Sequence, residues 1–337
     1  MERGNDARFA SVRILRKGFA MRRLIALATV ASLMVLGLTA GAGPTQAKVF
    51  GRNGEILFAR YDPNQDDSVI YTINPDGSDL TLVLPFALEC PNWSPNGTEI
   101  ATCGGLGATS VIVDPDSGTY RELFAADPSL FLACPVWSPD AKRLACDQFQ
   151  SPVDPSRIGL YTLRASDGGG IRRVTSIGPG GDDRPEDFSP DGKRIVFIRA
   201  DPTRPIVTSE AVFVVNTDGT GLHRLSPWGY RGFDMAAGWS PDGKTILFSS
   251  NGNLFRVHPD GSGLAQISLA GITGWSFAFQ PGWSPDGTKI VFSMVDKTSP
   301  EGIFTANSDG TDVQQLTVAP SDSQDDGGDW GPHPASA

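Results

Sequence analysis

Histidine is nearly absent from this chain, which has three in 337 residues. Histidine is the usual side chain for metal ligation and for proton transfer near neutral pH. The three residues His223, His258 and His333 are far apart, and the last is in the C-terminal tail. The sequence therefore predicts no imidazole cluster and disfavours enzymes that need one to hold a divalent metal.

Several short catalytic and nucleotide-binding motifs are also missing. No Walker-type sequence, no G-x-G-x-x-G fingerprint and no closely spaced Cys-x₂₋₄-Cys pair occurs. Gly104-Gly105-Leu106-Gly107 is rich in glycine, but no helical pattern follows it. After Ala47 no ten-residue segment has a helical hydrophobic period. These absences disfavour phosphate-cradling loops and indicate an all-β protein.

Positive charge is scarce once the N-terminus is set aside. The formal net charge is −10, and residues 1–47 contain seven Lys or Arg against two Asp or Glu, so the remainder carries −15. Nucleic acid and anionic lipid surfaces repel a polyanion of this kind. We therefore expect no nucleic-acid partner.

Residues 1–47 have the pattern of a secretory signal peptide. Basic residues precede an apolar run from Leu24 to Ala40, and small residues with Thr45-Gln46-Ala47 follow it. A permanent membrane anchor is the alternative, but the run is at the short end for a span. Met21 opens a more ordinary signal peptide and is an alternative start. We expect cleavage, no stable membrane insertion afterwards, and a secreted or periplasmic protein.

The four cysteines form two parallel pairs in CPNWSPNGTEIATC and CPVWSPDAKRLAC. An even number of cysteines in an exported chain favours disulfides. The two cysteines of each pair flank one copy of a motif that predicts a hairpin. The two cysteines would therefore meet at the open end of that hairpin. The predicted disulfides are Cys90–Cys103 and Cys134–Cys146, with a metal site as the alternative.

That motif, WSPDG, belongs to a repeat of about 47 residues. Copies start at Trp93, Trp137, Phe188, Trp239 and Trp283, and a partial copy at Trp330. A second motif with Asp-Gly or a related turn alternates with it, as in VFVVNTDGTGLHRLS. The apolar runs between these turns are rich in β-branched and aromatic residues, as expected for strands. Each Asp-Gly turn supplies the φ > 0 position that a hairpin requires.

One repeat is therefore four antiparallel strands, and the fold class predicted is an all-β, six-bladed β-propeller. The mature chain begins with GEILFAR, which lacks the first strand of a repeat, and finishes with DWGP, which supplies one. The C-terminal strand would close the ring beside N-terminal strands and leave no exposed edge there. The expected divisions are signal peptide 1–47, propeller 48–331 and tail 332–337.

The unit WSPDGKTILF followed by a strand and a second Asp-Gly turn resembles the TolB-type, WD-repeat-like β-propeller over residues 54–331. The resemblance implies a fold rather than a function, because this repeat also builds sensor domains and the non-catalytic parts of hydrolases. Nothing in the chain resembles the domain that usually precedes the TolB propeller. A hydrolase domain is not expected either, because the last repeat ends a few residues before Ala337.

The repeated turns contain the residues that most resemble catalytic ones. Ser240 in GWSPD is similar to a nucleophile elbow, but Pro241 and Asp242 stand where that motif requires x-Gly. Asp191, Asp242 and Asp286 have a local role in each turn, so we interpret them as structural. No catalytic residue is predicted.

Binding is expected instead on the face opposite the short hairpins, where the connections are long and irregular. The aromatic and Arg side chains of these connections favour contact with a partner, although Trp228 and Trp275 could equally fill gaps between blades. Acidic residues that precede the inner strands, Glu186 among them, would lie near the mouth of the central channel and could attract a basic peptide or hold Ca²⁺; solvated loop carboxylates are the alternative. The candidate ligand-binding residues are Trp228, Tyr230, Arg231, Trp275, Asp182, Asp183, Asp325 and Asp326.

The sequence therefore favours a secreted, monomeric, non-enzymatic module that binds a protein or peptide and needs no cofactor, apart from Ca²⁺ if the acidic loops hold it. The alternative from another class is a carbohydrate-active lyase or hydrolase that uses loop carboxylates and a bound divalent metal. A purely structural envelope protein is the third interpretation.

Overall fold

The computed structural model describes residues 52–86, 88, 90–103, 109–148, 154–230, 236–272, 276–296 and 301–332, all within the compact unit Thr45–Ala337. These residues form 24 strands and two short 3₁₀ helices, η1 (Pro155–Arg157) and η2 (Ile206–Thr208). The predicted signal peptide, residues 1–47, lies outside the described residues.

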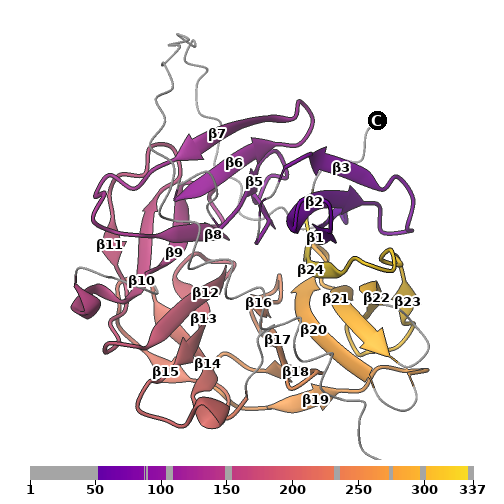
Figure 1. Ribbon diagram of the computed structural model, residues 1–337. Helices are drawn as coiled ribbons and strands as arrows, with labels where there is room; N and C mark the ends of the chain where they lie inside the picture. Colours follow the sequence, from indigo (N-terminus) through magenta and orange to yellow (C-terminus); the bar gives the residue numbers. More distant parts are fainter. Residues whose placement is uncertain are drawn as a thin grey trace, which may run out of the picture. The chain divides into compact units, whose positions relative to one another are not determined.

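The strands form six four-stranded antiparallel sheets that follow one another around a ring (Figure 1). The six-bladed propeller predicted from the repeat is confirmed. Blade 1 consists of β24 (Asp325–Trp330), β1 (Ile56–Asp62), β2 (Asp67–Ile73) and β3 (Thr81–Leu84), and blade 2 of β4 (Asn92–Trp93), β5 (Ile100–Ala101), β6 (Ser110–Asp114) and β7 (Thr119–Leu123). Blade 3 consists of β8 (Ala133–Trp137), β9 (Arg143–Gln148), β10 (Gly159–Arg164) and β11 (Arg172–Arg173), and blade 4 of β12 (Asp182–Phe188), β13 (Arg194–Ala200), β14 (Glu210–Asn216) and β15 (His223–Arg224). Blade 5 consists of β16 (Ala237–Trp239), β17 (Ile246–Ser250), β18 (Asn253–Val257) and β19 (Ala265–Ile267), and blade 6 of β20 (Ser276–Trp283), β21 (Lys289–Asp296), β22 (Gly302–Asn307) and β23 (Gln314–Gln315).

The C-terminal strand closes the ring. β24 is the innermost strand of blade 1 and pairs antiparallel with β1, with Trp330 opposite Ile56 and Asp325 opposite Arg60 (Figure 1). The Trp330 indole N–H also donates to the carbonyl of Gly54, at 2.9 Å. The predicted closure is confirmed, and it covers the edge that β1 would otherwise expose.

The hydrophobic core lies between blades. One cluster joins Ala145 and Leu160 of blade 3 to Phe188, Ile195 and Phe197 of blade 4. Each inner and middle strand has a neighbouring blade on both faces, which explains why runs such as IVFI are apolar at every position. Strand direction alternates within a blade, so the first–second and third–fourth hairpins share one face, here called the hairpin face. The second–third loops and the links between blades form the other, here called the irregular face.

Both disulfides expected from the sequence are present. Cys90–Cys103 joins the ends of the first two strands of blade 2, and Cys134–Cys146 joins the first two strands of blade 3. Their Cα atoms are 5.2 Å and 4.0 Å apart. The second pair is one residue closer in sequence, and a bulge in β8 between Ala133 and Val136 accompanies it. Both bridges lie at the irregular-face end of the hairpin.

Candidate functional site

The WSPDG turns use their polar groups internally. The Ser240 hydroxyl donates to Asp242 Oδ1 at 2.7 Å and accepts the backbone N–H of Thr245 at 2.9 Å. Asp242 also accepts the backbone N–H of Lys244, at 3.1 Å. These hydrogen bonds hold the pKa of Asp242 below its usual range, with the Ser240 hydroxyl as the main cause. Ser240 has the geometry of a turn residue, and neither described histidine is among its hydrogen-bond partners.

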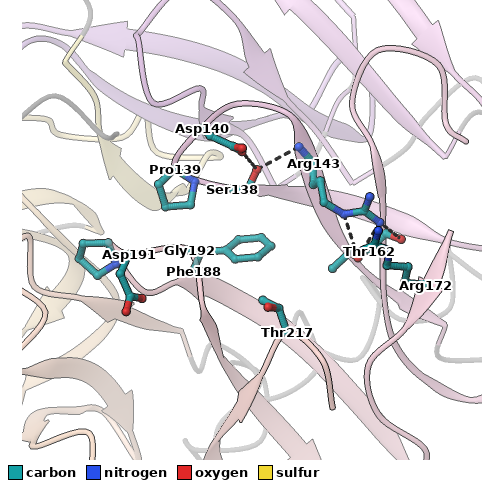
Figure 2. A pocket seen from close by; sticks show the side chains of 11 residues that line it. Ser138, Pro139, Asp140, Arg143, Thr162, Arg172, Phe188, Asp191, Gly192 and Thr217 are labelled. Atoms are coloured by element: carbon teal, nitrogen blue, oxygen red, sulfur yellow. Dashed lines mark hydrogen bonds between the residues drawn. The ribbon is translucent and has the colours of Figure 1, made fainter. Parts of the chain in front are cut away.

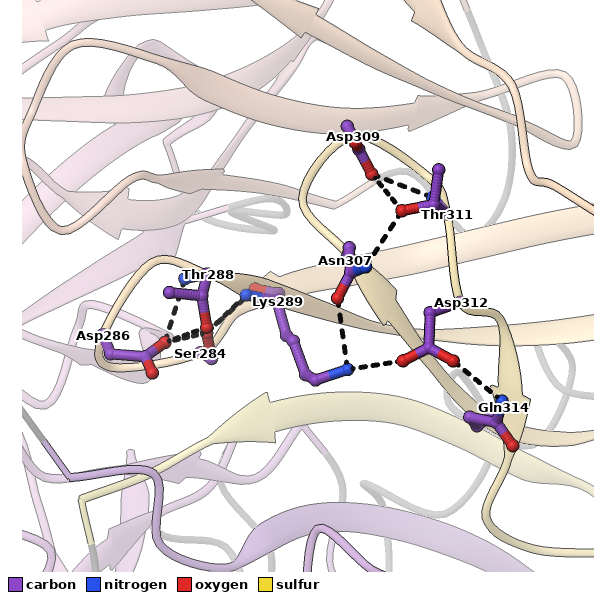
Figure 3. Close-up of polar contacts among 9 residues, drawn as sticks. All are labelled: Ser284, Asp286, Thr288, Lys289, Asn307, Asp309, Thr311, Asp312 and Gln314. Atoms are coloured by element: carbon purple, nitrogen blue, oxygen red, sulfur yellow. Dashed lines mark hydrogen bonds and ion pairs between the residues drawn. The ribbon is translucent and has the colours of Figure 1, made fainter.

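The same arrangement recurs in blade 6, where both hairpins can be followed in Figure 3. Ser284 and Asp286 form the first turn, and Asp309 forms the second by accepting from the backbone N–H and the hydroxyl of Thr311 at 3.0 and 2.6 Å. Lys289, at the start of β21, donates from its ammonium group to the carboxylate of Asp312 at 3.1 Å and so connects the two hairpins. The repeated aspartates are therefore satisfied inside their own turns, and the hairpin face owes its uniformity to them.

Two of the candidate carboxylates are buried ion pairs. Arg199 binds Asp183 through two hydrogen bonds of 2.7 Å, and Arg60 binds Asp325 at 2.5 and 2.7 Å. Asp183 is 1% exposed and Asp325 is 0% exposed. Bidentate guanidinium–carboxylate pairs are strong and geometrically specific. The two pairs occupy equivalent positions in blades 4 and 1.

Each pair is completed by a threonine of the preceding blade. Thr175 donates its hydroxyl to Asp183 at 2.5 Å, and Thr317 does the same for Asp325 at 2.6 Å. The placement of these aspartates in loops before the inner strands is wrong, because they belong to β12 and β24 themselves. The sequence could not show this, since the arginines that bury them come from β13 and β1. Asp183 and Asp325 stabilise contacts between blades.

A second pair of aspartates in the same strands fastens the following blade. Asp187 accepts the backbone N–H of Trp239 at 2.8 Å, and Asp329 accepts that of Trp93 at 2.7 Å. Charged residues on the innermost strands of blades 1 and 4 are therefore largely structural.

The remaining polar groups of β12 form an ionic network near the propeller axis. Arg184 lies 2.8 Å from Glu210 and 3.7 Å from Asp182. Both acids are less than a quarter exposed at the side chain. Asp326, the equivalent candidate on β24, is half-buried. Asp182 and Asp326 are thus the candidate acids that stay partly accessible on the irregular face.

Glu186 lies on β12, two residues after Arg184. Burial raises the pKa of its carboxyl to about 8, an effect opposed by the positive charge of Arg184 and by the backbone N–H of Ala237. Glu186 is half-buried, and the surrounding strands replace much of the water that would stabilise its charged form. The sequence could identify Glu186 as acidic but not as a group that is protonated near neutral pH.

This shift predicts a pH dependence of stability. Between pH 4.5 and 8 the folded protein holds a proton on Glu186 that the unfolded chain has lost, so the contribution of Glu186 to stability falls as pH rises through that window. Glu186→Gln should remove this fall, and its advantage over wild type should grow from pH 5 to pH 8. Urea denaturation of both proteins at several pH values measures it. Parallel pH profiles would contradict the assignment.

The aromatic candidates pack against blades. Trp228 is half-buried, its ring is 5.5 Å from Phe213, and the guanidinium of Arg204 lies 4.3 Å from its centroid. Tyr230 is half-buried against Phe248 and Phe255, at 6.0 and 5.1 Å. These contacts agree with gap filling at blades 4 and 5, and both side chains stay partly exposed. The other two candidates, Arg231 and Trp275, lie outside the described residues.

No metal centre is apparent in the part of the chain that the structure describes. There, no three His, Cys, Asp or Glu side chains are grouped so that they could hold a metal ion. His223 contacts two backbone carbonyl oxygens, those of Gly221 and Pro259, through its two ring nitrogens. His333 lies outside the described ranges. The use of Ca²⁺ by the acidic loops stays a prediction.

The structure adds a feature that sequence reasoning missed, a cleft of about 320 Å³ between blades 3 and 4 on the hairpin face (Figure 2). Its signal in the sequence is Phe188, which stands where the five other copies of the motif have Trp. The lining residues from blade 3 are Ser138, Pro139, Asp140, Arg143, Thr162 and Arg172, and those from blade 4 are Phe188, Pro190, Asp191, Gly192 and Thr217.

Solved structures share this fold. A putative TolB from Agrobacterium tumefaciens is 21% identical, with 83% of this chain and 92% of that chain covered and a TM-score of 0.57. TolB from Acinetobacter baumannii is 17% identical, with coverage of 82% and 66% and a TM-score of 0.61. A chain of a nidogen/laminin complex is 11% identical, with coverage of 83% and 99% and a TM-score of 0.60.

No protein-family model and no curated protein matches the sequence. At these identities the likeness shows the fold alone, and it confirms that the chain has the TolB-type propeller fold. The chain spans about two thirds of the Acinetobacter protein. Among the described residues, no helix has the length and apolar character needed to cross a membrane.

Proposed function

We propose that this chain is an extracytoplasmic, non-enzymatic binding module that holds a basic segment of a protein or peptide on its irregular face. The predicted signal peptide and the two disulfides support export. The TolB-type propeller fold supports a binding role, because such a scaffold presents variable loops on a rigid ring. A carbohydrate-active lyase or hydrolase has no supporting observation in the described residues.

The charge of the irregular face carries this proposal. Five arginines in the described part of this face pair with carboxylates: Arg60 with Asp325, Arg157 with Asp127, Arg184 with Glu210, Arg199 with Asp183, and Arg204 with Asp201. Asp66 and Asp322 on the same face are exposed, and no Lys or Arg of the described ranges forms an ion pair with either; Asp66 accepts the Tyr61 hydroxyl at 2.8 Å. A face that neutralises its own cations and presents carboxylates attracts a basic partner and repels an acidic one.

Charge-neutralising variants test the proposal. The double variant Asp66→Asn/Asp322→Asn keeps side-chain shape, and Asn tolerates the positive φ of 51° at residue 66. Immobilised wild-type protein, incubated with envelope extract and cross-linked, should retain a protein identified by mass spectrometry. We expect its retention to fall severalfold in the variant and in high salt.

The matched control is Asp79→Asn/Asp312→Asn on the hairpin face. Both residues have a φ of 54° and are exposed, so the same charge is removed on the other side of the ring, together with the ion pair of Asp312 with Lys289. Retention by the control should equal that of wild type. The proposal fails if wild type retains no protein, if both variants behave alike, or if the protein instead degrades polysaccharide in a metal-dependent reaction.

A further inference from the structure

Two guanidinium groups share the cleft between blades 3 and 4 without a carboxylate bound to either one in the described part of the chain. Arg143 donates to the hydroxyl and carbonyl oxygens of Thr162 and to the carbonyl of Gly170. Arg172, on the exposed outer strand β11, forms no ion pair with any residue that the structure describes. Seven of the fourteen arginines that the structure describes pair with Asp or Glu. Among the other seven, Arg143 and Arg172 are distinguished because both line one cleft.

The neighbouring junction between blades 4 and 5 has an arginine at the same position and fills the corresponding space. There Arg194, which occupies the position of Arg143, lies over the ring of Trp239 at 4.5 Å from its centroid. In the cleft the corresponding aromatic residue is Phe188, whose single ring is smaller than an indole. The Arg143 side chain turns to Thr162 instead. The junction between blades 3 and 4 therefore keeps an open cleft with the positive charge of Arg143 in its lining.

The cleft is polarised. In Figure 2 the ring of Phe188 lies between Arg143 and Arg172 on one side and Asp191 on the other. Asp191 and Asp140 accept hydrogen bonds inside their own turns, from Ser189 and Ser138. The pKa of Arg143 is lowered by burial and by the nearby charges of Arg172 and Arg164, and the carboxylate of Asp140 opposes this shift. An anion at the arginine end would relieve this repulsion, whereas one at the aspartate end would be repelled.

We propose that this cleft binds one carboxylate or phosphate group, carried by a small molecule or by the end of a peptide chain, through Arg143 and Arg172. Planar guanidinium groups are suited to both anions because they donate paired hydrogen bonds. The volume of about 320 Å³ is at the lower end for small-molecule sites and suits a ligand of a few residues or less. The cleft lies on the hairpin face, so it is independent of the proposed partner site.

Titration calorimetry of the purified protein tests this with three probes: acetyl-dialanine with a free carboxylate, its C-terminal amide, and inorganic phosphate. We expect the carboxylate, phosphate or both to bind with a dissociation constant of about 1 mM or less and the amide not to bind. Arg172→Gln should weaken binding about tenfold, as expected for loss of a charge-assisted hydrogen bond. Tighter binding of the carboxylate would indicate that the natural ligand is the end of a peptide chain, and tighter binding of phosphate would indicate a phosphate-bearing molecule.

Phe188→Trp provides a second variant, because it introduces the residue found in the five other copies of the motif. The indole should fill the cleft and abolish binding without lowering the melting temperature. Arg256→Gln, at an exposed arginine of blade 5, is the control and should bind as wild type does. The proposal is wrong if neither anion binds below about 10 mM, if the amide binds as well as the acid, or if Arg172→Gln leaves the affinity unchanged.

Discussion

Asp325→Ala is expected to lower the free energy of unfolding by about 3–5 kcal/mol, because it leaves the guanidinium of Arg60 buried without its partner. Asp325 is 0% exposed, and the Arg60 side chain is 13% exposed. The change also removes the acceptor for the Thr317 hydroxyl, at the strand that closes the ring. Equilibrium denaturation in urea, followed by tryptophan fluorescence, measures the effect.

Asp326→Ala is the matched control, because Asp326 is the next residue of β24 and is half-buried. Its effect should be within about 1 kcal/mol, as for most partly exposed substitutions. Replacing both members of the ion pair, in Arg60→Met/Asp325→Leu, should recover most of the lost stability. Equal losses for Asp325→Ala and Asp326→Ala would show that the buried pair does not hold the closing strand.

Removal of the Cys90–Cys103 disulfide is expected to cost about 2–4 kcal/mol, because it frees a closed loop in the unfolded chain. We expect blade 2 to depend on this bridge more than blade 3 depends on Cys134–Cys146. Its first two strands, β4 and β5, are only two residues long each, whereas β8 and β9 have five and six residues. The double variant Cys90→Ser/Cys103→Ser, compared with wild type by thermal denaturation, measures the loss.

Hydrogen exchange of the same variant tests where the loss occurs. The backbone amides of Trp93 and Ala101 should exchange faster, while those of Leu144 in blade 3 should not change. Cys90 is exposed and Cys103 is partly exposed, so replacing them with serine should leave no large packing defect in the core. A loss of stability can then be assigned to the missing bridge. Mass spectrometry should first show that the wild-type protein carries the bridge. An equal melting temperature for wild type and the double variant would then contradict this account.

The fold was predictable because its information is local. Most first–second turns carry a Ser–Asp hydrogen bond and a positive-φ glycine, such as Gly243 and Gly287. Five such turns, with Asn96 in place of Asp in blade 2, specify strand ends and directions without knowledge of any distant contact. Even SPDA in blade 3, where Ala141 adopts a φ of 56°, keeps the same turn.

The roles of individual carboxylates were not predictable, because they depend on residues of other strands. Asp182 and Asp183 are adjacent in sequence, yet one stays partly exposed and the other is buried by Arg199. The substitution of Phe188 for Trp was visible in the alignment of repeats. Its consequence was not, because the cleft also needs Arg143 and Arg172 from the neighbouring blade.

The central claim is that a partner binds the irregular face, and footprinting of the captured complex tests it most directly. Hydroxyl-radical labelling with mass spectrometry should show protection of Tyr61, Trp228 and Tyr230 on the irregular-face side, and no change at Leu222 on the outer strand region of blade 4. Protection confined to the hairpin turns, for example around Pro139 and Pro190, with full labelling of Tyr61 and Trp228, would contradict the account.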